Sequence, residues 1–91
     1  MENIEDGWHL TKELDTEFRK NENFAIEILE AMAKFLKNDW GITCEEDKKL
    51  NDKAVETGDP IIATYETCLG NIFIISEKGH MVNTVLFAKE Y

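Results

Sequence analysis

The hydrophobic pattern of the chain changes its period between the first two thirds and the last third. Across residues 21–38 the apolar residues recur every three or four positions, which is the spacing of an amphipathic helix. From Ile61 onward β-branched residues dominate, and apolar positions alternate or run together as they do in β-strands. The pattern predicts a two-layer α+β fold in which a long helix covers one face of a sheet.

The long helix, residues 21–38, has recognisable ends. Asn21 is a suitable N-cap, and Gly41 is placed to end the helix as a left-handed residue. We expect Trp40 to fold back on the core, and Glu30 and Lys34 to form an i,i+4 ion pair. The apolar stripe consists of Phe24, Ala25, Ile28, Leu29, Met32, Phe35 and Leu36.

A shorter second helix is predicted from Thr43 to Gly58. Thr43 and Glu46 have the spacing of a capping box, and Gly58 with the following Asp59-Pro60 ends the helix. Its apolar stripe is narrow, so we expect most of this helix to be in contact with water. The stripe consists of Leu50, Ala54 and Val55.

Three strands are predicted in the last third, at residues 61–67, 72–76 and 81–87. The turns are expected at Gly70-Asn71 and around Gly79, and short turns of this kind join antiparallel strands. The middle strand is a continuous apolar run, which predicts a central strand covered on both faces. The predicted sheet is therefore an antiparallel three-stranded meander.

The N-terminal region leaves two alternatives open. Residues 1–7 are expected to be frayed, and the 91 residues as a whole predict a single domain, 1–91. Trp8 and Leu10 alternate as in an edge strand, whereas residues 12–14 suit the start of a helix equally well. A strand within residues 8–14 would make the sheet four-stranded. Asp15-Thr16 is expected to cap a single helical turn that carries Phe18.

Charge is the strongest signal in the composition. The chain has 19 acidic and 10 basic residues, and 16 of the acidic and 8 of the basic residues lie within residues 1–60. This charge should repel nucleic acid and anionic membranes and favour binding to basic surfaces. The alternative is that acidity only keeps a small protein soluble. A basic stripe for direct nucleic-acid binding is absent from the sequence.

Motifs for catalysis and metal binding are also absent from the sequence. It contains no GxSxG, P-loop or GxGxxG motif, and His9 and His80 do not have metal-ligand spacing. Cys44 and Cys68 form neither a zinc cluster nor a CxxC motif. We therefore expect no enzymatic activity, no cofactor and no metal. The acidic start lacks the basic region of a signal peptide, and no apolar run approaches the ~20 residues of a membrane span, so a cytoplasmic location is expected.

The second helix and its flanks hold the candidate partner-binding residues. Their carboxylates could replace nucleic-acid phosphates in a basic groove by ion pairing. Lys48, Lys49 and Lys53 interrupt the acidic pattern, and this mixture favours recognition of a protein. The candidate residues are Asp39, Glu45, Glu46, Asp47, Asp52, Glu56 and Asp59.

Several short motifs, in order, resemble a known family. They are Asp39-Trp40-Gly41, Glu46-Asp47-Lys48, Leu50-Asn51-Asp52 with Ala54, Gly58, Tyr65-Glu66, Ile72-Phe73-Ile74-Ile75-Ser76-Glu77, Thr84-Val85-Leu86-Phe87 and Glu90-Tyr91. Over roughly residues 22–91 the chain resembles the short "plasmid-related" proteins of Gram-positive bacteria and their plasmids, conjugative elements and phages. The chain departs from that family at residues 78–80, where relatives tend to have Trp-Asp-Arg, and at Phe73 and Ala88, where tryptophan and proline are common.

The resemblance implies a mobile-element accessory protein and, by similarity to one group of small acidic proteins, an anti-CRISPR inhibitor of a type II RNA-guided nuclease. Such an inhibitor would bind the basic nucleic-acid surface of its target and act as a DNA mimic. The alternative is a regulatory or structural accessory protein that forms homo-oligomers through an exposed sheet edge.

Overall fold

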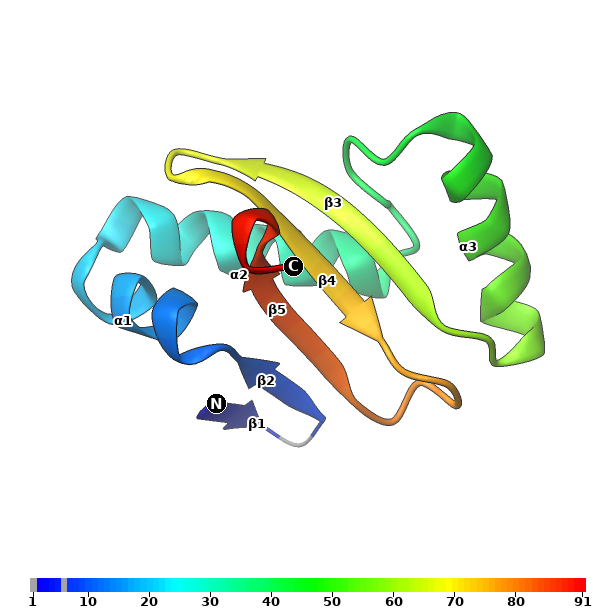
Figure 1. The fold of residues 1–91 in the computed structure, drawn as a ribbon, viewed down its shortest axis with the longest axis horizontal. Helices are drawn as coiled ribbons and strands as arrows, with labels where there is room; N and C mark the ends of the chain where they lie inside the picture. Colours follow the sequence, from blue (N-terminus) through cyan, green and yellow to red (C-terminus); the bar gives the residue numbers. More distant parts are fainter. Residues whose placement is uncertain (1, 6) are drawn as a thin grey trace.

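The protein, described by a computed structural model, consists of a five-stranded sheet with helices packed on one face and along one edge (Figure 1). The structure describes residues 2–5 and 7–91, with residues 2–5 described through their backbone. The α+β class predicted from the sequence is confirmed. The elements in chain order are β1 (Glu2–Glu5), β2 (Trp8–Leu10), α1 (Lys12–Lys20), α2 (Glu22–Leu36), α3 (Glu45–Thr57), β3 (Ile61–Thr67), β4 (Gly70–Ser76), β5 (Asn83–Phe87) and the 3₁₀ turn η1 (Ala88–Glu90).

The sheet is mixed, and the prediction of an antiparallel sheet is therefore wrong. The strand order is β1-β2-β5-β4-β3, and β3, β4 and β5 form the expected antiparallel meander. β2 pairs with β5 in parallel, with Trp8 opposite Asn83 and Leu10 opposite Val85. Parallel pairing needs a long crossover, and the three helices with β3 and β4 supply it between β2 and β5.

The N-terminal region uses both predicted alternatives in succession. Trp8–Leu10 is a strand, and the next helix already begins at Lys12, where Thr11 accepts a hydrogen bond from the Leu14 N–H. α1 is therefore longer than the single turn predicted at Asp15-Thr16. β2 is not an edge strand, because β1, which falls within the segment expected to be frayed, pairs antiparallel with its outer side.

α2 forms as predicted but ends earlier. Asn21 caps it by accepting a hydrogen bond from the Phe24 N–H at 3.0 Å. The helix ends at Leu36, and the left-handed residue after it is Asn38, with φ of 62°. The prediction that Gly41 ends this helix is wrong. Gly41 also has a positive φ, and it lies so close to β3 that a Cβ there would overlap the Thr64 carbonyl oxygen and the Tyr65 ring, so the position requires glycine.

The core lies between α1, α2 and the inner face of the sheet. Phe24 of α2 stacks on Phe87 of β5, with ring centroids 5.5 Å apart. Trp40 folds back on this core as expected and meets Phe35 edge to face at 5.3 Å. The predicted stripe on α2 is too wide, because Leu29 and Leu36 are 51% and 68% exposed. The fully buried side chains of the core include Leu10, Leu14, Phe24, Ile28, Ile72, Ile74 and Val85.

α3 lies beside the edge strand β3 (Figure 1). It buries Asn51 and Ala54, whereas Leu50 of the predicted stripe is 64% exposed. The predicted capping box is wrong: Cys44 is the N-cap, and the Thr43 hydroxyl donates to the Trp40 carbonyl and accepts from the Thr64 N–H at 2.8 Å. Thr43 thus ties the α2–α3 linker to β3 instead of starting a helix.

The outer face of the sheet differs from the prediction for residues 72–76. Ile72, Ile74 and Ser76 are buried on the inner face, but Phe73 and Ile75 on the outer face remain half-buried. β4 is therefore covered by helices on one face. The hairpin turn before it is Cys68-Leu69, two residues earlier than predicted, because Thr67 already pairs with Gly70.

Candidate protein-binding surface

The seven predicted partner-binding carboxylates are all exposed. They lie on α3 or next to it, so the structure gathers them at one end of the molecule (Figure 1). At 3.6 residues per turn, Glu45, Asp52 and Glu56 share one face of α3, with Lys49 between them. Opposite charges are therefore mixed on this face. The seven exposed residues are Asp39, Glu45, Glu46, Asp47, Asp52, Glu56 and Asp59.

Three of the seven carboxylates also hold local structure. The Asp52 carboxylate accepts a hydrogen bond from the Trp40 indole N–H at 2.8 Å. Asp39 accepts from the Gly41 N–H at 3.1 Å, and Asp59 accepts from the Thr57 hydroxyl at 2.9 Å. Replacing these three would disturb the linker, Trp40 or the end of α3, so they are poor positions for a test of binding alone.

The other four carboxylates are free to meet a partner. Glu45 makes a long ion pair with Lys48 at 3.5 Å, and both side chains contact solvent. Glu46, Asp47 and Glu56 have no hydrogen bond or ion pair within the described part of the chain. Exposed ion pairs contribute little to stability, so Glu56 can be changed at low cost to the fold. Glu45, Glu46 and Asp47 lie in the first turn of α3, where negative charge favours the helix dipole by about 0.3–1 kcal/mol each.

A cleft of ≈ 180 Å³, lined by apolar side chains and by Asn38, Ser76, His80 and Asn83, lies beside the acidic face of α3. Trp40 lines the cleft, and its indole N–H donates a hydrogen bond to the Asp52 carboxylate. The cleft is therefore next to one of the α3 carboxylates. At the far side, the His80 Nε2 lies 2.7 Å from the Asp59 carbonyl oxygen. The sequence analysis did not predict this cleft. Leu36 and Val55, which belong to the predicted apolar stripes of α2 and α3, both line it and could have indicated it. Its lining residues include Phe35, Leu36, Trp40, Val55, Ile61 and Ser76.

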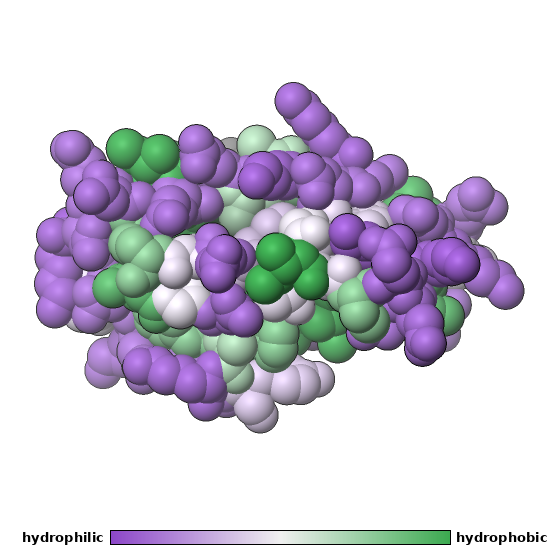
Figure 2. Space-filling view, turned by 90° about the horizontal axis from the view of Figure 1, so that it is seen from above, coloured by the Kyte–Doolittle hydropathy of each residue, from purple (hydrophilic) through white to green (hydrophobic). Residues whose placement is uncertain are grey.

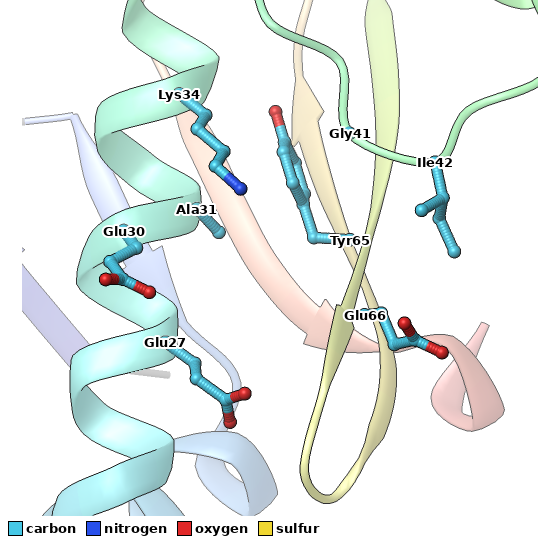
Figure 3. A pocket seen from close by; sticks show the side chains of 8 residues that line it. All are labelled: Glu27, Glu30, Ala31, Lys34, Gly41, Ile42, Tyr65 and Glu66. Atoms are coloured by element: carbon cyan, nitrogen blue, oxygen red, sulfur yellow. The ribbon is translucent and has the colours of Figure 1, made fainter.

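A second hollow, the α2–β3 groove, adds acidic residues that the sequence analysis did not single out (Figure 3). It measures ≈ 320 Å³ and includes Glu27, Glu30 and Glu66 among its lining residues. The groove has one ammonium, on Lys34, which points toward Tyr65 (Figure 3). The predicted Glu30–Lys34 ion pair is therefore not formed. The exposed position of Glu66 on β3 follows from strand alternation and could have been found that way.

Hydrogen bonds from Cys68 favour the ionised form of one groove carboxylate, Glu27. The Cys68 N–H donates to Glu27 at 2.9 Å, and this bond with that of the Cys68 thiol lowers the pKa of Glu27. The same carboxylate raises the pKa of the Cys68 thiol. Burial raises the pKa of Tyr65, whose hydroxyl donates to the Asp39 carbonyl at 2.7 Å. Tyr65 therefore stays neutral beside an ionised Glu27.

The other candidate chemistry is sparse. Cys44 and Cys68 are free and exposed. Within residues 2–5 and 7–91, no three His, Cys, Asp or Glu side chains are grouped as metal ligands. In the same part of the chain, none of the helices has both the length and the apolar character that crossing a membrane requires.

The surface seen from above has charged ends and a less polar middle. Figure 2 shows hydrophilic residues over both ends of the molecule, with apolar and weakly polar residues between them. Comparisons of the chain with protein-family models, with curated proteins and with solved structures found no match.

Proposed function

We propose that the protein is a non-enzymatic inhibitor from a mobile genetic element that binds a basic surface of a host defence nuclease. The first candidate target is a type II RNA-guided effector, as the resemblance to small mobile-element proteins implies. The observation that supports this proposal is the set of exposed carboxylates on α3 that accept no side-chain or backbone hydrogen bond within the described residues, Glu45, Glu46, Asp47 and Glu56.

Ion pairs between the carboxylates of this protein and the basic surface of the nuclease would hold the two proteins together and would compete with nucleic acid for that surface. Carboxylates that occupy a basic channel exclude nucleic-acid phosphates, and this binding weakens as salt rises. Lys48, Lys49 and Lys53 on the same helix make the pattern specific for a protein surface of mixed charge. The cleft at Trp40 adds a hollow with apolar and polar walls that a side chain of the partner could fill.

The proposal is tested by capturing purified type II effector on the tagged protein, with and without guide RNA, at low and high salt. Capture that guide RNA competes away and that salt weakens supports an acidic mimic in the nucleic-acid channel. Capture that neither guide RNA nor salt affects contradicts the mimic and indicates a different protein surface. Failure to capture the effector under every condition contradicts this target.

A matched pair of variants locates the binding surface. Glu46→Lys with Glu56→Lys reverses two free acids on α3 and should abolish capture. Glu13→Lys with Glu17→Lys reverses two acids on α1, at the opposite end of the molecule, and should leave capture intact (Figure 1). Equal loss in both double variants would show that net charge alone matters and would contradict the α3 surface.

The alternative function, a homo-oligomeric accessory protein, is supported by a different observation. The outer face of the sheet carries apolar side chains and, within the described residues, no α-helix covers it; η1 and Tyr91 cover only the part around Phe73. Pairing through the β3 edge, as the sequence analysis supposed, is hindered there. The Asn51 amide donates to the Ile62 carbonyl at 2.9 Å, and the Ile42 N–H and the Thr43 hydroxyl occupy the backbone groups of Thr64.

A further inference from the structure

The outer face of the sheet presents two rows of side chains in register across four strands. In the first row Ile62 lies opposite Ile75, which lies opposite Thr84, with His9 at the end. In the second row Thr64, Phe73 and Leu86 lie side by side. Cross-strand neighbours of this kind form a continuous surface.

Only part of this surface is covered. η1 follows β5, and Tyr91 beyond it packs edge to face on Phe73 with ring centroids 5.5 Å apart. The row of Ile62 and Ile75 lies outside that contact, and Leu50 of α3 adjoins it beside Ile62. Ile62 and Tyr91 are 39% and 75% exposed. We call the exposed surface formed by Leu50, Ile62, Phe73, Ile75 and Tyr91 the open face.

The two rows contain no carboxylate, ammonium or guanidinium, although 32% of the residues in the chain are charged. A basic partner would meet carboxylates only at the margin of the open face, from Asp47 beside Leu50 and from Glu66 beyond Thr64 on β3. A second copy offers the same uncharged surface, so two copies can meet there without bringing their acidic ends together. Their net charge of −9 each would oppose association through the α3 end or the groove.

Sheet geometry also favours a second copy. Two sheets pack face to face about 10 Å apart with their strands roughly aligned, and a two-fold axis makes such a contact self-complementary and closed. Strand spacing and rise give the open face an area on the order of 400 Å² per copy. Two copies would bury about 800 Å² in total, which is below the about 1,200 Å² of standard specific interfaces, so the dimer should be weak and reversible.

We infer that the protein forms a two-fold homodimer in which the open faces of two copies pack against each other. Ile75 lies at the centre of the contact, with Ile62 and Phe73 beside it, and the α3 face that carries Glu45, Asp52 and Glu56 stays on the outside. The dimer presents two copies of the acidic surface, and it would form whether or not the protein inhibits a nuclease.

Sedimentation equilibrium over protein concentrations from about 5 to 500 μM tests this inference. The wild-type protein should change from monomer toward dimer across this range. High salt should preserve or strengthen the dimer, because it screens the repulsion between acidic copies. Salt has the opposite effect on capture of a basic partner, so the two proposals can fail separately. A monomer at every concentration would overturn the inference.

Two variants and a control place the contact. Ile62→Lys puts a charge on the open face. Ile75→Thr keeps a β-branched strand residue but replaces an apolar group at the centre of the contact with a hydroxyl. Each variant should weaken the dimer at least about tenfold. Leu29→Lys is the matched control, since it changes an exposed apolar residue of α2 outside the open face. Circular dichroism checks the fold of each variant. A dimer that both open-face variants retain, or that Leu29→Lys weakens equally, contradicts this interface.

Discussion

α2 and α3 have similar lengths but are attached to the molecule in different ways. α2 has 15 residues and buries Phe24, Ile28, Ala31, Met32 and Phe35 against the sheet. α3 has 13 residues and buries only Asn51 and Ala54. Two side-chain hydrogen bonds help to hold α3 in place: Asn51 to the Ile62 carbonyl, and the Trp40 indole to Asp52.

The difference shows how so small a chain can separate stability from recognition. Burial of apolar area is the main favourable term in folding, and α2 supplies much of it, so its sequence is constrained. α3 covers the edge of β3 through a few directional bonds. The remaining faces of α3 need not pack, which leaves them free to carry the charges proposed to bind a partner.

The largest effect should come from α2. Phe24→Ala removes a fully buried ring that stacks on Phe87, and the cavity should lower the free energy of unfolding by about 3–5 kcal/mol. Leu50→Ala on α3 is the contrasting change, expected to stay within about 0.5 kcal/mol because that side chain is exposed. Urea unfolding measures both. Equal losses in the free energy of unfolding would contradict the proposal that α2 provides stability and α3 provides recognition.

A smaller effect is expected when the attachment of α3 is broken. Asn51→Ala leaves the Ile62 carbonyl without its side-chain partner and should cost about 1–3 kcal/mol. Because α3 depends on few contacts, amide hydrogen exchange should accelerate in α3 more than in α2. Lys53→Ala, at an exposed position of the same helix, is the control. Unchanged exchange in α3 of the Asn51 variant would show that packing, not this bond, holds the helix.

Elements that depend on local pattern could be predicted from the sequence. The 3.6-residue stripe and the Asn21 cap locate α2, Gly58 ends α3, and alternation places Ile61, Ala63 and Tyr65 on the buried face of β3. The exposure of the candidate acids follows from the narrow apolar stripe of α3 in the same way. These features need no knowledge of distant partners.

Features that depend on residues far apart in the chain could not be predicted. Thr43 has a good capping sequence, yet its hydroxyl accepts a hydrogen bond from the N–H of Thr64, 21 residues away, and does not cap α3. Gly41 looks like a helix terminator, but its close approach to β3 explains it. β2 pairs in parallel with a strand more than 70 residues later, and the cleft at Trp40 requires three separate segments to meet.

The smallest effect concerns the polar face of α2, which also helps to position the β3–β4 turn. The Glu27 carboxylate accepts a hydrogen bond from the Cys68 N–H. The pKa of Glu27 is lowered, which means that the folded state favours the ionised carboxylate. Because the pKa of Glu27 is lower in the folded state, ionisation of Glu27 stabilises the fold at pH values above its unfolded pKa near 4.5. This stabilisation is lost as the pH falls through the folded pKa. Glu27 is largely solvated, so screening keeps the effect small.

Glu27→Gln should therefore be less stable than the wild type at pH 7, and the difference should shrink below about pH 4. Urea unfolding at pH 7, 5 and 3.5 measures it, and subtracting the variant from the wild type cancels the titration of the other acids. Glu30→Gln, one turn along α2, removes a groove carboxylate without removing a bond to the turn. If both variants gave the same pH dependence, the effect would come from the general charge of the groove, and α2 would have no specific polar link to the β3–β4 turn.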